Sequence, residues 1–197
     1  MTGRVFLVRH GRTALNAAGR LRSHLDPPLD EVGRDEAAAV AAELWEWRIV
    51  KILSSPLLRA LQTAGAIAEA VGVPVTAVDD LIDRDYGRWA GELEAAVVAR
   101  FGSLDAAPGV EPQRAVAERS LALLEAQLPA LEHSDVILVS HEAVNKALLT
   151  HLDPGVGSTL IQPTGCWHEI RRNHDRWTVT RIDQRPELAM DSQDDDR

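Results

Sequence analysis

The strongest constraint on this fold is an alternation of short apolar runs with longer helical segments. The short runs are rich in β-branched residues, and the longer segments repeat their apolar positions every three or four residues. Such alternation is typical of a mostly parallel sheet with helices on both faces. We predict strands at 5–8, 49–53, 73–78 and 136–139, and helices at about 33–47, 57–71 and 116–131.

The C-terminal part has a different pattern. Residues 166–171 and 176–182 alternate polar and apolar side chains around the turn-forming segment 173–175, which predicts a hairpin at a sheet edge. The predicted fold class is α/β, a three-layer αβα sandwich whose central sheet is mostly parallel with an antiparallel C-terminal edge. We expect one domain over 1–185, a lid or cap within 79–110, and an acidic, disordered tail over 186–197.

Composition excludes several classes of protein. The chain has 197 residues, 45% of them hydrophobic, which suffices for a sizeable core. Its net charge of −9 disfavours binding to nucleic acid or to an anionic membrane surface. A single cysteine, Cys166, excludes an intramolecular disulfide and a multi-cysteine metal site. With no apolar stretch of about 18 residues and no secretion signal, we expect a cytoplasmic protein. A homodimer stays open, because the five tryptophans suit a core or an interface.

Two predicted strands end in the same way. The first runs into Arg9-His10 and the fourth into Ser140-His141. Ligands of open α/β sheets bind at the carboxyl ends of the strands, so both imidazoles stand where a ligand is expected. The alternative is that each histidine only bonds to nearby backbone, which is harder to maintain for two histidines at matching places.

The end of the strand predicted at 49–53 supplies another cation. Ser54, Ser55 and Pro56 signal a helix start, which places Arg59 in the first helical turn. A helix N-terminus beside an arginine favours an anion, although a surface salt bridge would explain Arg59 equally simply. With Arg9 and the two histidines, Arg59 forms a candidate cationic cluster suited to phosphate oxygens. The chain has no GxxxxGK[ST] loop for binding a nucleotide.

These residues belong to a longer series of motifs. The chain reads LVRHGRTALN at 7–16, DPPL at 26–29 followed by Gly33, SSPLLRALQTA at 54–64, YGRWAG at 86–91 and VSH at 139–141. In this order, over about 5–149, the motifs resemble those of the histidine phosphatase superfamily, in its phosphoglycerate-mutase-like branch.

The resemblance implies a mechanism without metal or cofactor. His10 would attack phosphorus and become a phosphohistidine, which water would then hydrolyse. Arg9, Arg59 and His141 would hold the phosphoryl oxygens, and Asn16 would add a hydrogen bond. General chemistry agrees, because a neutral imidazole is a competent nucleophile and phosphoryl transfer depends mostly on positioning and charge stabilisation.

One departure concerns the proton donor. Family members usually carry a glutamate four residues before the glycine that follows an aromatic residue, here Gly87, and Asp83 stands at that position. Aspartate is shorter by about 1.5 Å, one C–C bond, so Asp83 can be the general acid if the loop lies further inward or the substrate binds deeper. Asp85 is the alternative donor. Both acids could instead pair with neighbouring arginines on a solvated loop.

Two further departures concern the substrate. Arg22-Ser23 stands where the family often has Gln-Gly or Ser-Gly, so these residues are candidate phosphate-binding groups, and Arg22 would favour a substrate with a second anionic group. Glu142-Ala143 replaces the Gly-Gly pair that often follows the second histidine. A glutamate at a helix start suits the helix dipole, so we interpret Glu142 as structural.

Rival readings depend on weaker signals. Cys166 and Arg172 have the C-x5-R spacing of cysteine phosphatases, but the residues between them are bulky and typical of a strand. The HEAVN segment at 141–145 lacks the second histidine of a zinc motif. We therefore predict hydrolysis of a small phosphomonoester. The alternatives are a mutase-type phosphotransferase, disfavoured by a short segment after Gly91, and a phosphate-binding module with little turnover.

Overall fold

Alternating side chains in the central strands set the layers of this protein, for which a computed structural model describes residues 3–132, 134–174 and 176–188. In β1 (Arg4–Arg9), Val5 and Leu7 belong to one buried apolar cluster, whereas Phe6 and Val8 belong to another. A strand that buries both faces requires apolar helices on each side.

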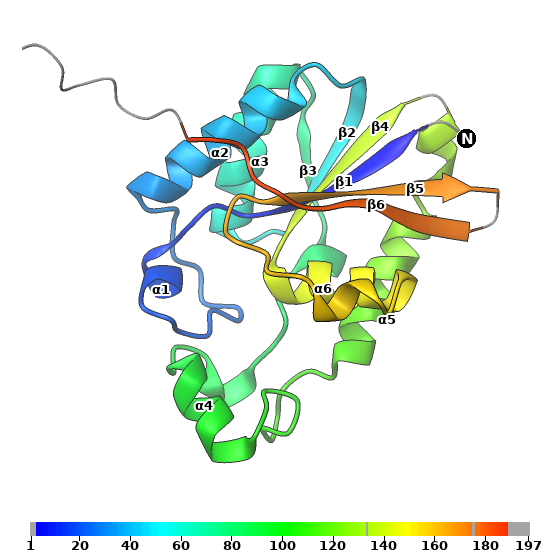
Figure 1. Ribbon diagram of the computed structural model, residues 1–197. Coiled ribbons are helices and arrows are strands. Elements are labelled where there is room, and N and C mark those ends of the chain that lie inside the picture. Colours follow the sequence, from blue (N-terminus) through cyan, green and yellow to red (C-terminus); the bar gives the residue numbers. More distant parts are fainter. Residues whose placement is uncertain (1–2, 133, 175, 189–197) are drawn as a thin grey trace, which may run out of the picture.

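The sheet has six strands in the order β3-β2-β4-β1-β5-β6 (Figure 1). β2 (Ile49–Ser54), β3 (Val75–Ala77) and β4 (Asp135–Ser140) run parallel to β1 in one continuous ladder. β5 (Trp167–Asn173) and β6 (Arg176–Gln184) are antiparallel and form the C-terminal edge. The predicted sheet is therefore confirmed.

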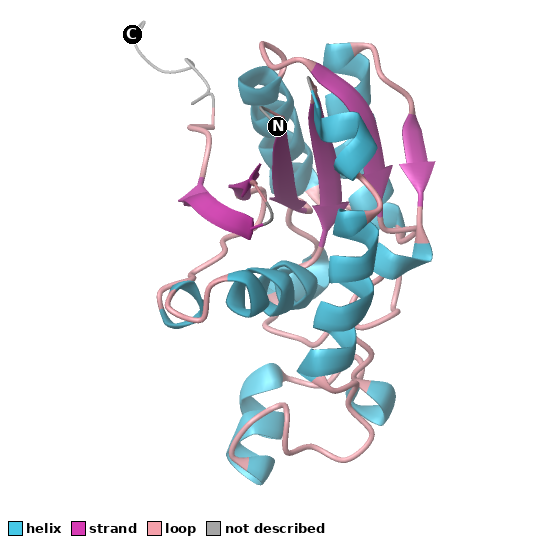
Figure 2. Cartoon of the chain, turned by 90° about the vertical axis from the view of Figure 1, so that its right-hand side faces the viewer, coloured by secondary structure: helices cyan, strands magenta, loops and turns pink. Residues whose placement is uncertain are grey.

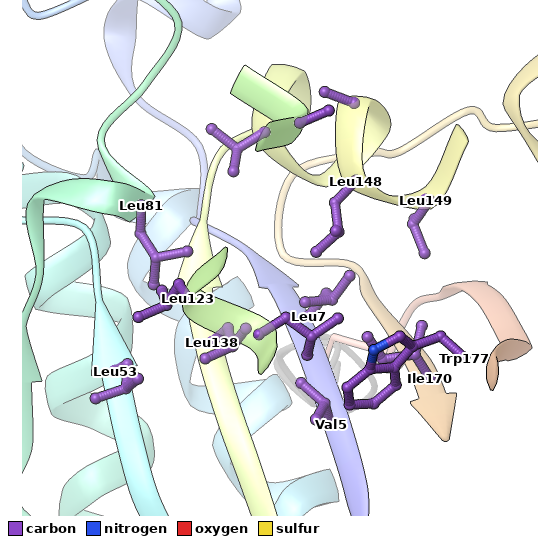
Figure 3. Close-up of a cluster of buried hydrophobic side chains, with 14 of the residues drawn as sticks. Val5, Leu7, Leu53, Leu81, Leu123, Leu138, Leu148, Leu149, Ile170 and Trp177 are labelled. Atoms are coloured by element: carbon purple, nitrogen blue, oxygen red, sulfur yellow. The ribbon is translucent and has the colours of Figure 1, made fainter. Parts of the chain in front are cut away.

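Helices cover both faces of this sheet (Figures 1 and 2). α2 (Glu31–Leu44) and α3 (Leu58–Val71) pack on the face that carries Phe6. α5 (Gln113–Glu125) and α6 (Glu142–Leu152) pack on the opposite face, where Leu148 and Leu149 approach Leu7 (Figure 3). The three-layer prediction is confirmed, and of the described helices none is both long and apolar enough to cross a membrane.

Two predicted elements are shorter than expected because proline interrupts them. The strand expected at 73–78 is limited to Val75–Ala77, after Pro74, which has no N–H to donate to a ladder. The helix expected at 116–131 begins earlier and ends at Glu125, and a 3₁₀ turn over Leu128–Glu132 contains Pro129.

The segment expected to form a cap lies beyond the carboxyl ends of the parallel strands. It contains two 3₁₀ turns, Asp79–Leu81 and Gly87–Trp89, and the helix α4 (Glu94–Phe101), which stands apart from the sheet in Figure 1. This segment has an apolar cluster of its own, made by Leu21, Tyr86, Trp89, Val97 and Ala107. Most of the tail predicted at 186–197 lies outside the described residues.

Two glycines let α2 approach the loop that follows β1. A Cβ on Gly11 would lie 2.2 Å from the Gly33 carbonyl oxygen, and one on Gly33 would lie 2.0 Å from the Arg12 carbonyl oxygen. Backbone atoms cannot retreat as a flexible side chain can. This contact therefore fixes the residues that follow His10 against the start of α2.

We predict that Gly33→Ala lowers the free energy of unfolding by about 1–3 kcal/mol, the usual cost of overpacking. The matched control is Gly65→Ala, in α3, where a Cβ meets nothing within 4 Å. That change should raise stability by about 0.5–1 kcal/mol through helix propensity. Urea unfolding measures both, and equal effects would contradict the close approach at Gly33.

Candidate active site

The parallel strands bring the two predicted histidines together. The register pairs Arg9 with Ser140, so β1 and β4 end side by side. His10 and His141 follow directly, and their ring centroids are 5.0 Å apart. Both side chains are fully buried. The prediction that the two strand ends share one site is thus met by the geometry.

The hydrogen bonds of His10 define its tautomer. Nδ1 lies 2.7 Å from the Gly11 carbonyl oxygen, which can only accept, so the ring proton is on Nδ1. Arg59 Nε donates to Nε2 at 3.3 Å, which likewise requires a lone pair on Nε2. Burial lowers the pKa of His10 well below 6.5, and the charges of His141, Arg59 and Arg9 lower it further. His10 is therefore a neutral imidazole with a nucleophilic Nε2 at neutral pH.

The helix α3 positions Arg59 at its first turn. Pro56 precedes the helix, and an Asp26 carboxylate oxygen accepts the N–H of Leu58 at 2.6 Å. This acceptor satisfies one of the N–H groups that every helix start leaves free, and an anion there suits the helix dipole. The motif at 26–29 thus contributes to the site by fixing where α3 begins.

The guanidinium of Arg59 is fully buried and connects three segments. Besides its bond to His10, Nη1 donates to the Leu25 carbonyl oxygen at 2.7 Å, and Nη2 donates to that of Ser23 at 3.0 Å. Nη2 also donates to Asp83 Oδ2 at 2.9 Å. Arg59 therefore links the nucleophile, the loop at 23–25 and the loop that carries Asp83.

The structure brings Asp83, rather than Asp85, to the histidines. Asp83 is buried, Oδ1 accepts the N–H of Arg84 at 2.9 Å, and Oδ2 lies 3.7 Å from His141 Nδ1. Asp85 is exposed, and its carboxylate accepts from the Gly87 N–H at 2.7 Å. Asp83 thus contacts Arg59 and approaches His141 with its shorter side chain.

A second group of charges near His10 comes from the end of β1, from the loop that carries Arg22 and from the start of α6. Arg9 Nη2 pairs with Glu142 Oε2 at 2.9 Å, and Arg22 Nη2 lies 3.7 Å from the same oxygen. Arg9 Nη1 also donates to the Gln162 carbonyl oxygen. Both arginine side chains are more than nine-tenths buried, which is costly without anionic partners.

Three buried nitrogen atoms at this site have no hydrogen-bond partner among the described residues. They are Arg9 Nε, Arg22 Nε and His141 Nδ1. The Nε2 of His141 lies 2.8 Å from the Ser55 hydroxyl; if that hydroxyl donates, the ring proton of His141 is on Nδ1. Unsatisfied buried donors around a neutral nucleophile fit an oxyanion with several oxygen atoms.

Comparisons with known proteins agree with this geometry. The family model described as histidine phosphatase superfamily (branch 1) matches residues 5–185. The chain belongs to this superfamily.

As a histidine phosphatase, it is a phosphomonoesterase of that family and has characterised relatives. It is 34% identical over 165 residues to a glucosyl-3-phosphoglycerate phosphatase of Mycolicibacterium vanbaalenii, which covers 76% of this chain and 73% of the relative. It is 35% identical over 157 residues to a metal-independent phosphoserine phosphatase of Arabidopsis thaliana, covering 73% and 66%. A mycobacterial glucosyl-3-phosphoglycerate phosphatase in complex with VO₃ superposes with a TM-score of 0.83 at 28% identity, covering 92% and 98%.

Two residues predicted to bind phosphate are engaged locally in this histidine phosphatase. The Ser23 hydroxyl donates to Asp85 at 3.2 Å and accepts the N–H of Tyr86 at 3.0 Å. Asn16 Oδ1 accepts from the N–H and hydroxyl of Thr13, at 3.2 and 2.7 Å. Ser23 thus holds the cap segment in place, and the Asn16 side chain takes part in the N-terminal cap of the short helix α1 (Ala14–Ala17).

Sequence reasoning missed three contributors to the site. Ser55 bonds to His141, Gln162 accepts from Arg9, and Glu142, which we interpreted as structural, forms ion pairs with Arg9 and Arg22. A signal existed only for Ser55, in the helix-start motif, and for Glu142, in the departure from Gly-Gly. Gln162 follows from tertiary contacts that its neighbours do not reveal.

A second cluster of potential ligand atoms is fully engaged in holding a loop. Cys166, His168 and Asp183 offer atoms within 4.8 Å of one another. However, His168 Nδ1 accepts the N–H of Asp183 at 3.1 Å, and the two carboxylate oxygens accept the N–H groups of Ile161 and Gln162, both at 2.9 Å. Because Nδ1 of His168 accepts a hydrogen bond, the ring proton is on Nε2, the nitrogen that faces Cys166. A protonated Nε2 cannot bind a metal ion, and a metal-binding histidine usually donates from its other ring nitrogen.

The cysteine-phosphatase alternative also fails on geometry. Burial raises the pKa of Cys166 to about 12, which suppresses the thiolate that such an enzyme needs. Arg172 lies on β5 and pairs with Glu125 at 2.8 Å. No phosphate-binding loop therefore joins Cys166 to Arg172.

Proposed function

We propose that this protein hydrolyses a small phosphomonoester without a metal ion, through a phosphohistidine on Nε2 of His10. The observation that carries the proposal is a buried, neutral imidazole whose Nε2 has its lone pair beside Arg59. Arg9, Arg22 and His141 supply further donors for phosphoryl oxygens. Fixed cationic donors of this kind stabilise the charge of a phosphoryl-transfer transition state.

In the first step, Nε2 forms a bond to phosphorus while the ester P–O bond breaks. The electron pair of that bond goes to the leaving oxygen, which takes a proton from Asp83 and departs as an alcohol. A phosphoryl dianion that pairs with Arg59 leaves Asp83 beside a second negative charge. General acid catalysis requires that this carboxyl group carries a proton when the substrate is bound.

In the second step, water attacks phosphorus and the N–P bond breaks. Its electron pair returns to Nε2, and the Asp83 carboxylate accepts the proton that water loses. Inorganic phosphate then leaves. The Nδ1–H bond to Gly11 persists through both steps and holds the ring at a fixed angle.

We also propose that the leaving alcohol carries a carboxylate. A cavity of about 280 Å³ beside the site has a mixed lining, in which the cations of Arg22, Arg84 and Lys146 stand with the carboxylates of Glu94, Asp105 and Glu142. Arg84 is already paired with Asp105. The Lys146 ammonium has no ion-pair partner among the described residues, so it is available to a ligand. Phosphoserine and glucosyl-3-phosphoglycerate, the substrates in the names of two relatives, are both phosphate esters of carboxylated alcohols.

A screen of phosphomonoesters tests the hydrolytic function. The wild-type protein should release phosphate in the presence of a chelator and yield an acid-labile phosphohistidine when quenched, detected by mass spectrometry. His10→Ala should abolish both signals. His151→Ala, which removes an exposed histidine at the end of α6, is the matched control and should retain them. Labelling of His10 followed by no turnover would favour the binding-module alternative, and transfer to a second substrate would favour a mutase.

The role of Asp83 is tested by comparing leaving groups. Asp83→Asn should lower kcat about 10²–10⁴-fold for an alkyl phosphate, the usual contribution of general acid catalysis. The loss should be much smaller for p-nitrophenyl phosphate, whose leaving group needs no proton.

The control is Asp85→Asn, which should affect both substrates alike. Thermal unfolding checks that Asp83→Asn still folds, since the change also breaks the buried pair with Arg59. Equal losses for good and poor leaving groups would show that Asp83 only positions Arg59.

A further inference from the structure

Glu142 places a carboxylate between two arginines of the proposed phosphoryl site. Oε2 is 2.9 Å from Arg9 Nη2 and 3.7 Å from Arg22 Nη2. The arginine side chains are 8% and 9% exposed, whereas that of Glu142 is 39% exposed. A partly exposed anion therefore occupies donors that belong to two buried cations.

The backbone under Glu142 is fixed, so only its side chain is free to move. Gln162 Nε2 donates to the Glu142 carbonyl oxygen at 3.2 Å, while the Gln162 carbonyl oxygen accepts from Arg9. The two oxygens of Asp183 hold the segment at 161–162 in turn. The arginine stays in place, and the exposed carboxylate has a route into solvent.

An arriving oxyanion meets a site that is already partly neutralised. Within the part of the chain that the structure describes, Arg9 and Arg22 each keep a buried Nε–H without a partner, so each can still donate to an anion besides Glu142. A phosphoryl oxygen that binds the terminal nitrogen atoms of Arg9 must displace the carboxylate or share those donors with it, at a cost in like-charge repulsion.

We propose that Glu142 is a specificity-determining residue, an internal counter-anion that competes with free oxyanions for Arg9 and Arg22. The inference rests on the proposed function, because the arginine donors for which Glu142 and an oxyanion compete belong to the proposed phosphoryl site. Bare inorganic phosphate, which gains nothing in the neighbouring cavity, is held weakly and leaves readily. A complete phosphomonoester displaces the carboxylate with the help of the contacts of its leaving group.

A purely structural role for Glu142 predicts the opposite sign. If the carboxylate only kept Arg9 in position, its removal would disorder Arg9 and weaken phosphate binding. If the carboxylate competes, its removal strengthens phosphate binding. The direction of the change therefore separates the two roles.

The experiment measures the Kd of inorganic phosphate by calorimetry and its Ki in a phosphatase assay, for the wild type and Glu142→Gln. We expect both constants to fall about three- to tenfold, as for loss of one partly exposed ionic competitor. Glu31→Gln is the matched control, because Glu31 is also the first residue of a helix, α2, and is exposed. It removes the same charge and the same helix-dipole contact away from the site, so phosphate binding should stay at the wild-type level.

An unchanged or higher Kd in a folded Glu142→Gln variant would overturn the inference. Equal tightening in Glu31→Gln would also overturn it, because the effect would then reflect net charge alone. Calorimetry needs no turnover, so these outcomes are distinct from failure of the proposed function, in which the wild type would bind phosphate but hydrolyse no phosphomonoester.

Discussion

The buried guanidinium of Arg59 is the group on which the rest of the site depends. A fully buried charge is costly unless its donors are satisfied, and here they bond to His10, Asp83 and two loop carbonyl groups. These partners belong to three different parts of the chain. The hydrogen bonds of the Arg59 guanidinium thus hold the end of β1, the loop at 23–25 and the cap segment against one another.

The charges of the site are arranged so that both imidazoles stay neutral. The chain is acidic overall, yet three arginines are buried around two histidines. This arrangement keeps the imidazoles neutral, since the pKa of His141, like that of His10, is lowered by burial and by the nearby arginines. Asp83 and Glu142 form ion pairs with these arginines. In the proposed mechanism a phosphoryl dianion binds the same donors, and its binding changes the role of both acids.

The parts of this site that local sequence determines were predictable. Short apolar runs rich in β-branched residues identified β1 and β4, and parallel pairing then placed His10 beside His141. Arg59 followed from the helix-start signal at Pro56. The family resemblance supplied the chemical roles and singled out Asp83, although only tertiary structure separates it from Asp85. The contacts of Glu142 and Gln162 were not predictable, because they depend on loops far apart in the sequence. Ser23 was expected to bind phosphate, and its hydroxyl instead bonds to Asp85 and Tyr86, in a cap segment that sequence alone could not place.

The central claim is that His10 stays neutral, with its proton on Nδ1 and its lone pair on Nε2. ¹⁵N NMR of the imidazole groups measures this directly, with His10 assigned by comparison with His10→Ala. A lowered pKa means that the folded protein binds the proton only at a pH below the ordinary value of 6.5. His10 should keep the neutral Nδ1–H tautomer as the pH falls through 6.5. A His10 ring that is protonated near pH 6.5, or that carries its single proton on Nε2, would contradict it.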